Sequence, residues 1–331
     1  MLEDQRSGAA YWIDHYVVPT ADVPRWSAFY EDVLGAVTRV DNRPRRTDRP
    51  AGLQFTDVGK CHVGGLPFAG ALAPVGVGPR YSWFIRPQEI EEHLRRLEAS
   101  GVAHSGPVKT SEEGEDGTGI RFADPDGNPL EFWAPARMPA GAMNDESAQK
   151  VGRVAVATFE SRNLAKTTEF YATYCGLDPL RSSDVAADTA VLPLAAGGRL
   201  VFKKVDKLGL RTGGHGIYRA CHTALVVRDD EFMSTLDRMY EDLPEWDYDP
   251  NDPPPFSPDE AEKLPARTGI HGNPGGPEWK RLRGRGDSFY DWDTNVYHFV
   301  AARPVGGSMA TFESVSQRTY LDKLRASEPS A

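Results

Sequence analysis

The chain has 331 residues and a formal net charge of −10, with 40% hydrophobic and 26% charged residues. This length accommodates two ordinary domains, and the composition is typical of a soluble globular protein. The acidic balance argues against nucleic acid as a partner, because such binding needs a basic face. No apolar run approaches the roughly 18–20 residues of a membrane span, and the first residues, MLEDQRSGAAYW, show no secretory signal.

The three cysteines, Cys61, Cys175 and Cys221, are too few and too scattered for a disulfide framework or an all-cysteine zinc site. A reducing, cytoplasmic location is therefore expected. Cys61 and Cys221 each precede a histidine, and strand alternation directs two neighbouring side chains to opposite faces. We expect the cysteines to be core residues.

Four segments of the chain repeat one order of elements: an apolar strand, a turn and a helix. The first, Ile13–Gly35, reads IDHYVVPTADVPRWSAFYEDVLG, and the third, Val154–Gly176, reads VAVATFESRNLAKTTEFYATYCG. The second and fourth, Tyr81–Gly101 and Cys221–Leu243, follow the pattern more loosely. Since β-rich segments with turns follow each helix, the sequence predicts four βαβββ modules.

A second repeat marks the ends of the even-numbered modules. Phe122–Ala134 reads FADPDGNPLEFWA and Phe289–Ala301 reads FYDWDTNVYHFVA, which share F-x-D-x-D-x-N-x-x-[E/H]-F-x-A. The two copies are offset by 289 − 122 = 167 residues, so Glu131 and His298 hold equivalent positions on a predicted last strand. The sequence thus exchanges one plausible metal ligand for another.

The repeats divide the chain into two predicted halves. The N-terminal domain covers residues 1–135, a linker rich in Ala, Pro and polar residues covers 136–150, the C-terminal domain covers 151–305, and a tail covers 306–331. Module four carries a Pro- and Gly-rich insertion near 248–287, which we expect to form a lid or an oligomer contact. The tail is expected to end in a short amphipathic helix, and the protein to be a homo-oligomer.

The sequence resembles the vicinal oxygen chelate superfamily, which includes glyoxalases, bleomycin- and fosfomycin-resistance proteins and extradiol ring-cleaving dioxygenases. The resemblance covers roughly residues 11–302 and is strong at IDH…FYEDVLG and at DPDGNPLEFW. It implies an α+β fold in which four βαβββ modules pair into two eight-stranded half-barrel domains around a cavity that holds a divalent metal. The ligands would occupy two positions per module, early in the first strand and on the last strand.

The first-strand positions can be found by counting seven residues back from each predicted helix start. The first-strand positions of modules one to four hold His15, Ser82, Val156 and His222. The last-strand positions of modules one, two and four hold His62, Glu131 and His298. Module three offers no obvious ligand on its last strand.

Two ligand sets remain open. If neighbouring modules pair, modules one and two supply His15, His62 and Glu131, and two histidines with one carboxylate form the ferrous oxygenase triad. If modules one and four pair, the site holds His15, His62, His222 and His298, and Glu131 has no role. The second arrangement resembles hydroquinone-type ring-cleaving dioxygenases.

Module four departs from the extradiol signature Y-x-x-D-P-x-G-x-x-x-E, because it has Ser, Trp and His at the Tyr, Pro and Glu positions. Tyr290 and Tyr297 lie close by and are candidate catalytic residues. His215, in TGGHGIYRACH, is a candidate general base, since the pKa of a histidine lies near neutrality. The histidines outside the ligand positions, His93, His104 and His271, are expected at the surface.

We expect a non-heme iron(II) dioxygenase that uses O2 to cleave a dihydroxylated aromatic of the catechol or hydroquinone class. An open metal position would bind the substrate or dioxygen. One alternative is a glyoxalase-like isomerase or lyase that uses Mn, Zn, Ni or Co. Another is a metal-free resistance protein that binds an aromatic ligand.

Overall fold

A computed structural model gives the fold of the chain. It describes residues 9–38, 54–67, 79–110, 114–143, 151–182, 185–208, 221–243, 245–246, 269–271, 288–291, 293 and 295–314. His215, most of the predicted insertion, residues 144–150 of the predicted linker and the predicted tail helix lie outside these residues.

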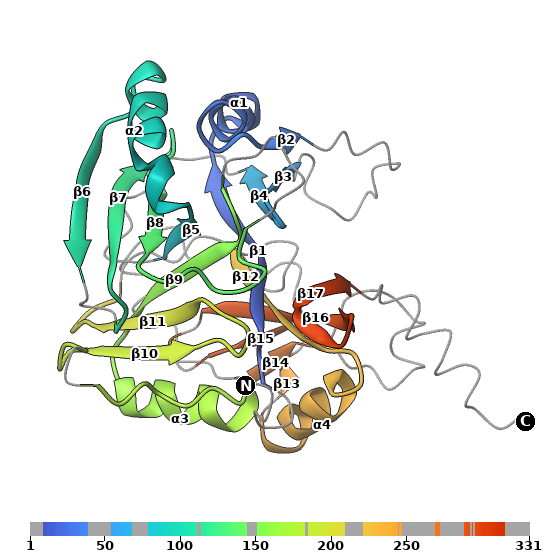
Figure 1. The fold of residues 1–331 in the computed structure, drawn as a ribbon. Helices are drawn as coiled ribbons and strands as arrows, with labels where there is room; N and C mark the ends of the chain where they lie inside the picture. Colours follow the sequence, from blue (N-terminus) through green and yellow to red (C-terminus); the bar gives the residue numbers. More distant parts are fainter. Residues whose placement is uncertain are drawn as a thin grey trace, which may run out of the picture.

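The first of two sheets, sheet A, joins modules one and four (Figure 1). Its ten strands follow the order β13-β14-β15-β16-β12-β1-β4-β3-β2, with β17 beside β16. They are β1 (Trp12–Thr20), β2 (Val37–Thr38), β3 (Gln54–Val58), β4 (Cys61–Pro67), β12 (His222–Arg228), β13 (Glu245–Trp246), β14 (Gly269–His271), β15 (Ser288–Tyr290), β16 (Val296–Val305) and β17 (Ser308–Ser314). The antiparallel pair β1–β12 connects the two modules.

Sheet B joins modules two and three through the antiparallel pair β5–β9. Its seven strands follow the order β10-β11-β9-β5-β8-β7-β6. They are β5 (Arg80–Phe84), β6 (His104–Thr110), β7 (Gly117–Ala123), β8 (Pro129–Pro135), β9 (Val154–Ser161), β10 (Thr189–Pro193) and β11 (Arg199–Lys204). Each sheet therefore draws on both halves of the chain.

Three helices begin at the predicted caps Asp22, Glu89 and Asn163, whereas the fourth begins after Glu231, two residues beyond the predicted start at Asp229. The helices are α1 (Val23–Leu34), the short 3-10 helix η1 (Pro87–Glu89), α2 (Ile90–Ala99), α3 (Leu164–Tyr174) and α4 (Phe232–Asp242). Asp22 caps the start of α1 by accepting a bond from a backbone N–H, and Asn163 does the same for α3. Gly35 ends α1 at a φ of 70°, a left-handed conformation that glycine adopts without a Cβ clash. Figure 1 shows α1 and α2 at one end of the molecule and α3 and α4 at the other.

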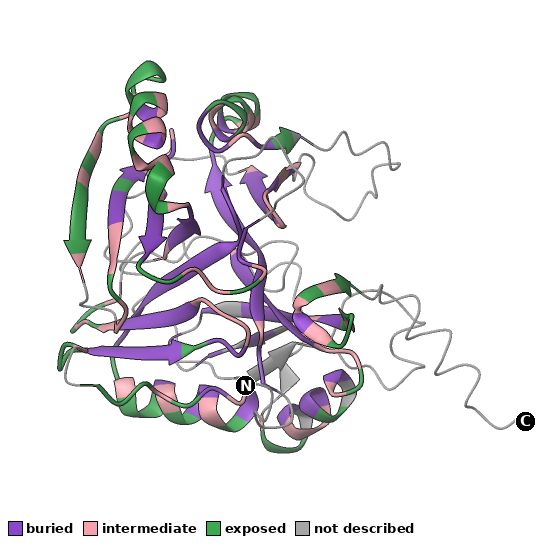
Figure 2. Cartoon of the chain, viewed as in Figure 1, coloured by how far each residue is buried: buried purple, intermediate pink, exposed green. Residues whose placement is uncertain are grey.

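The central strands are buried. β1 and β9 are buried at every position, and Figure 2 shows them as continuous buried ribbons. Strands covered on both faces usually read as nearly uninterrupted apolar runs, and β1 departs from that pattern at the buried polar residues Asp14 and His15. The predicted α+β class, with two curled sheets, is confirmed. Sheet A has more than eight strands because β14 and β17 enlarge it, and sheet B has seven because module three contributes three, β9, β10 and β11, in the described part of the chain.

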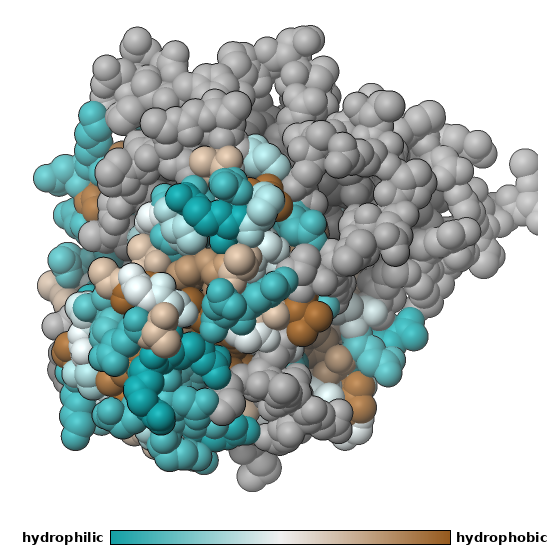
Figure 3. Space-filling model, turned by 90° about the horizontal axis from the view of Figure 1, so that it is seen from above, coloured by the Kyte–Doolittle hydropathy of each residue, from teal (hydrophilic) through white to brown (hydrophobic). Residues whose placement is uncertain are grey.

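Exposed large hydrophobic residues are scattered over the described part of the chain. Figure 3 shows mainly hydrophilic side chains with hydrophobic ones in small groups. The large hydrophobic residues that are exposed, Val37, Val108, Leu180 and Val305, lie on separate segments. None of the helices in the described part of the chain combines the length and apolar character needed to cross a membrane.

The repeated D-x-D-x-N sequence forms the same turn twice. Asp124 Oδ1 accepts from the backbone N–H groups of Asp126 and Asn128 at 2.9 Å each, and its Oδ2 accepts from Asn128 Nδ2 at 2.7 Å. The second copy makes the same three bonds at 2.9, 2.8 and 2.8 Å among Asp291, Asp293 and Asn295. The shared motif is therefore a turn-forming device, separate from the residue that follows it on the last strand.

Each of these turns also ties its module to the preceding one. Asp126 accepts from Thr20 Oγ1 at 2.7 Å and from Arg25 Nη2 at 3.0 Å, at the start of α1. Asp293 accepts from Thr167 Oγ1 at 3.2 Å, in α3, and from the Arg162 backbone N–H at 3.2 Å. Modules one and two, and modules three and four, are thus linked by their turns.

Candidate metal centre

Strand register places the predicted histidines of modules one and four on one face of sheet A. His15 lies opposite His62 on β4 and opposite Ala224 on β12. Ala224 in turn lies opposite His298 on β16. Residues in register project from the same face, and His222, two positions before Ala224, shares that face. The sheet therefore gathers side chains that are far apart in the sequence.

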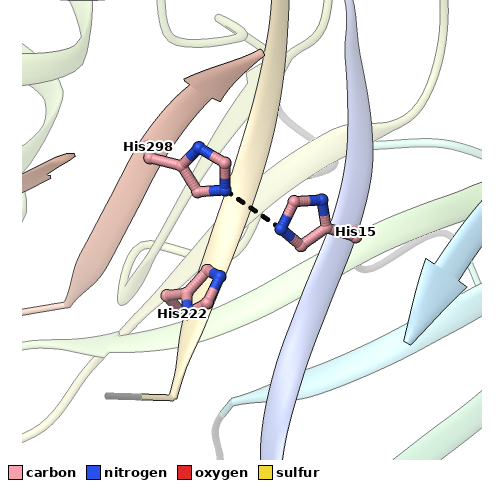
Figure 4. A group of neighbouring side chains, drawn as sticks. All are labelled: His15, His222 and His298. Carbon is pink, nitrogen blue, oxygen red and sulfur yellow. Dashed lines mark hydrogen bonds between the residues drawn. The ribbon is translucent and has the colours of Figure 1, made fainter. Parts of the chain in front are cut away.

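The imidazoles of His15, His222 and His298 converge between their strands (Figure 4). The Nε2 atoms of His15 and His298 are 3.0 Å apart. The ring of His222 lies 5.4 Å from that of His15 and 5.3 Å from that of His298, centroid to centroid. One nitrogen from each of the three rings lies within 4.8 Å of the others, and all three residues are buried.

Asp14 belongs to the same site, although we did not identify it from the sequence. Its Oδ2 atom accepts from His15 Nδ1 at 2.7 Å and lies 3.6 Å from His62 Nε2. Alternation along a regular strand would turn Asp14 away from His15, but the register of β1 against β12 shifts between Ile13 and His15. This bulge brings both side chains to the same side. The sequence signal that could have identified Asp14 is its position directly before the candidate ligand His15.

The protonation states suit metal ligation. Burial raises the pKa of the Asp14 carboxyl, but the hydrogen bond from His15 and the nearby imidazoles outweigh burial and lower it to about 2. Burial lowers the pKa of His15 to about 3, against the opposing effect of its hydrogen bond to Asp14. At neutral pH, His15 is therefore neutral. Its Nδ1–H donates to the Asp14 carboxylate, which leaves the Nε2 lone pair directed toward His298.

These residues fit a divalent metal ion. Two nitrogen ligands at about 2.1 Å from one ion and at right angles lie about 3.0 Å apart. That value matches the separation of the two Nε2 atoms, 3.0 Å. A carboxylate that accepts from the other ring nitrogen of a ligand is the usual partner of a metal-bound histidine. A second cluster of suitable donors comprises Asp14, His15 and His62.

Glu131 lies in sheet B and belongs to neither cluster among the described residues. It lies opposite Ser82, whose Oγ donates to Glu131 Oε2 at 2.5 Å. Arg121 Nε donates to Glu131 Oε1 at 3.1 Å, and Arg80 Nε lies 3.7 Å from Oε2. The buried carboxylate is thus held by a hydroxyl and two guanidinium groups.

The three candidate catalytic residues are not brought to the histidines by the described structure. Tyr297 is fully buried and stacks on Phe289 with centroids 5.5 Å apart. As the neighbour of His298 in β16, it points to the opposite face. Tyr290 lies in β15, but its side chain, like the whole of His215, is outside the described residues. Their catalytic roles stay predictions.

The burial of the remaining histidines and of Cys61 can be compared with the predictions. His93 is fully buried in α2, with its ring 4.4 Å from that of Phe132, so its expected surface position was wrong. The amphipathic pattern of α2 turns this position toward the sheet. His104 is partly exposed, and the side chain of His271 is outside the described residues. Cys61 lies in the core, as expected, and burial raises the pKa of its thiol to about 11.

Comparison with known proteins relates this architecture to a family. Residues 12–132 match the model of the Glyoxalase/Bleomycin resistance protein/Dioxygenase superfamily. No curated protein matches the chain. A Bacillus subtilis protein provisionally named a dioxygenase has a similar structure, with a TM-score of 0.59, 18% identity and coverage of 96% of each chain. Glyoxalase I from Zea mays has a TM-score of 0.53 and 14% identity, with 95% of each chain covered.

A single-residue variant of the maize enzyme has a TM-score of 0.52 and 16% identity, covering 88% of this chain and 92% of its own. At such identities the likeness to solved structures is one of fold. The match and the fold together confirm the resemblance seen in the sequence. Residues 12–132 thus match the Glyoxalase/Bleomycin resistance protein/Dioxygenase superfamily, and the chain has the vicinal oxygen chelate fold.

Proposed function

We propose that the protein is an extradiol-type dioxygenase that cleaves a dihydroxylated aromatic with O2, using a divalent metal held by His15, His222 and His298. The observation that carries the proposal is the convergence of these three buried imidazoles from β1, β12 and β16. Fe(II) is the ion we favour, since imidazole ligands with open positions suit non-heme iron oxygenases. The Bacillus subtilis neighbour supports the dioxygenase class by its provisional name.

When bound, the metal would act as a Lewis acid that holds the substrate oxygens and dioxygen at its open positions. Asp14 would fix the ring orientation and tautomer of His15 through their 2.7 Å hydrogen bond. It would also place one negative charge beside three neutral imidazoles. An anionic phenolate substrate would add further negative charge and strengthen binding at the dication.

His62 is placed to handle a proton. Its ring stacks on His15 with centroids 4.4 Å apart, and its side chain is 25% exposed, in contrast to the buried ligands. An imidazole near the surface can accept a proton from a substrate hydroxyl and release it to water. We therefore assign His62 the role of general base rather than that of a fourth ligand.

An aromatic substrate is favoured by the neighbouring side chain of Phe55. Its ring meets His15 edge-on at 6.0 Å and His62 at 5.5 Å, centroid to centroid. Aromatic rings prefer such offset or edge-to-face partners. Phe55 on β3 would thus form an apolar wall beside the metal.

A glyoxalase-like isomerase or lyase using Mn, Zn, Ni or Co is the second candidate. The observation in its favour is the cluster of Asp14, His15 and His62, which mixes a carboxylate with imidazoles within module one. The structural likeness to maize glyoxalase I points in the same direction. A metal-free protein that binds an aromatic ligand is the remaining reading.

The test begins with protein purified without oxygen and analysed for bound metal. The Fe(II)-loaded protein is then mixed with catechols and hydroquinones while O2 uptake and the yellow ring-fission product are recorded. We expect one metal per chain and stoichiometric O2 consumption. Isomerisation of the methylglyoxal–glutathione adduct by Ni- or Zn-loaded protein, without O2 uptake, would favour the second candidate. Absence of metal binding would overturn both.

A further inference from the structure

Sheet B carries three polar residues and one valine at the positions that correspond to the histidine row of sheet A. Glu131 lies opposite Ser82, Ser82 opposite Val156, and Val156 opposite Arg199 on β11. These side chains share one face because they are in register. Arg199 therefore stands at the module-three end of the row, where the sequence shows no metal ligand.

The guanidinium of Arg199 is buried and has one edge without an acceptor. Its side chain is 5% exposed, and its Nη1 donates to Glu115. Nε and Nη2 have no hydrogen-bond partner among the described residues. These two N–H groups form one side of the planar guanidinium, the fork that binds both oxygens of a carboxylate at once.

Trp133, whose ring contacts the guanidinium of Arg199, offers a third buried donor. Its ring lies 5.2 Å from Arg199 Cζ, and its buried Nε1–H also lacks an acceptor within the described part of the chain. A Cβ on Gly117 would lie 2.3 Å from the ring of Trp133, so the glycine is needed for the indole to lie there. Buried donors in native proteins almost always have an acceptor, because a buried N–H without one has lost its hydrogen bonds to water without replacement.

We propose that Arg199 and Trp133 form a binding site for the carboxylate of a small organic acid, separate from the histidine cluster of sheet A. Glu115 already balances the charge of Arg199, so a monoanion suits the site better than a phosphate dianion. The buried side chains of Phe84, Val156 and Val201 belong to the same apolar cluster as Trp133. They suit the hydrocarbon part of such an acid.

The test follows the indole N–H of Trp133 by NMR in ¹⁵N-labelled protein as sodium benzoate or acetate is added. Trp133→Phe assigns its signal among the 7 tryptophans of the chain. We expect a saturable shift of this one signal. Arg199→Met and Arg199→Lys should each weaken binding by about 10–100-fold, because neither retains the fork. Arg228→Met, which removes a partly exposed partner of Asp230, is the matched control and should leave the indole shift and the affinity unchanged.

Inorganic phosphate should bind at least about tenfold more weakly than benzoate if the site selects a monoanion. An indole signal that does not move with either carboxylate would overturn the proposal, as would a shift that persists unchanged in Arg199→Lys. If Arg199→Met does not fold, Arg199→Lys decides the matter because it keeps the charge and most of the length. The metal content of every variant should equal that of the original protein, which keeps this result independent of the proposed dioxygenase activity.

Discussion

Sheets A and B present the same strand positions with different chemistry. In sheet A these positions hold His15, His222 and His298, whose imidazoles converge. In sheet B they include Ser82 and Glu131, which are joined by a 2.5 Å hydrogen bond. The comparison shows that strand register decides which side chains meet, whereas residue type decides what they can do there.

The two central strand pairs share a register shift but differ in the residue at the shift. The shift lies between Ile13 and His15 in β1–β12 and beside Ser82 in β5–β9. In sheet A the extra residue is Asp14, whose carboxylate contacts His15. In sheet B it is Ala155 of β9, which has no polar group to offer. One backbone irregularity thus supports a polar network in one sheet and only packing in the other.

The largest expected effect comes from removing a ligand of sheet A. His15→Ala and His298→Ala should each weaken metal binding by at least about 100-fold, because each removes one of three nitrogen donors. Glu131→Gln, in sheet B, should leave metal binding unchanged. Metal competition against a chromophoric chelator measures all three. Loss of metal in Glu131→Gln with retention in His298→Ala would return the site to His15, His62 and Glu131.

Asp14→Asn tests the carboxylate that the bulge in β1 brings to His15. An asparagine can still accept one bond from His15, but it lacks the charge that orients the ring and raises ligand basicity. Metal affinity should fall by about 10–100-fold, less than for loss of a ligand. The same titration serves here, with the exposed Asp230→Asn as the control. Equal affinities would show that Asp14 only packs.

In sheet B, Glu131→Gln should act on stability instead. The change removes the charge that faces Arg121 and Arg80 and weakens the bond from Ser82, so the free energy of unfolding should fall by about 1–3 kcal/mol. Urea unfolding of the variant, of Ser82→Ala and of the double variant measures the loss and its coupling. Strictly additive losses would contradict a shared network.

The two Asp turns offer the smallest and most local comparison. Burial raises the pKa of Asp124 to about 7 and that of Asp291 to about 6, against the opposing hydrogen bonds from Asn128 and Asn295. A carboxyl in the unfolded chain has a pKa of about 3.9, so the folded state binds the extra proton between about pH 4 and these values. In that range each group lowers stability as pH rises, by up to about 1.4 kcal/mol per pH unit.

This effect is isolated by difference, because other groups titrate in the same range. The cost of Asp291→Asn, measured as the loss of unfolding free energy, should shrink from about pH 4 to pH 6 and then stay constant. The cost of Asp124→Asn should shrink up to about pH 7. A cost that is independent of pH would show that the carboxyl titrates normally in the folded protein.

Much of the fold and part of the candidate site follow from local patterns. The repeated modules place His15 and His222 at equivalent first-strand positions and His298 at the last-strand position of Glu131, and the family resemblance marks these positions as ligands. The pairing of β1 with β12 is a long-range contact and left two ligand sets open. The bulge at Asp14 and the ion pairs of Glu131 depend on neighbouring strands, so alternation along one strand could not reveal them.

Each of the four modules is linked to two others, so that the links form a closed ring. Sheets connect module one to four and two to three, while the Asp turns connect one to two and three to four. During synthesis, the histidine cluster cannot form until His298, 283 residues after His15, has been added to the chain. A nascent or truncated chain without its last module would therefore lack the site. It would also expose the edge of β1, and an exposed strand edge can pair with other chains and aggregate.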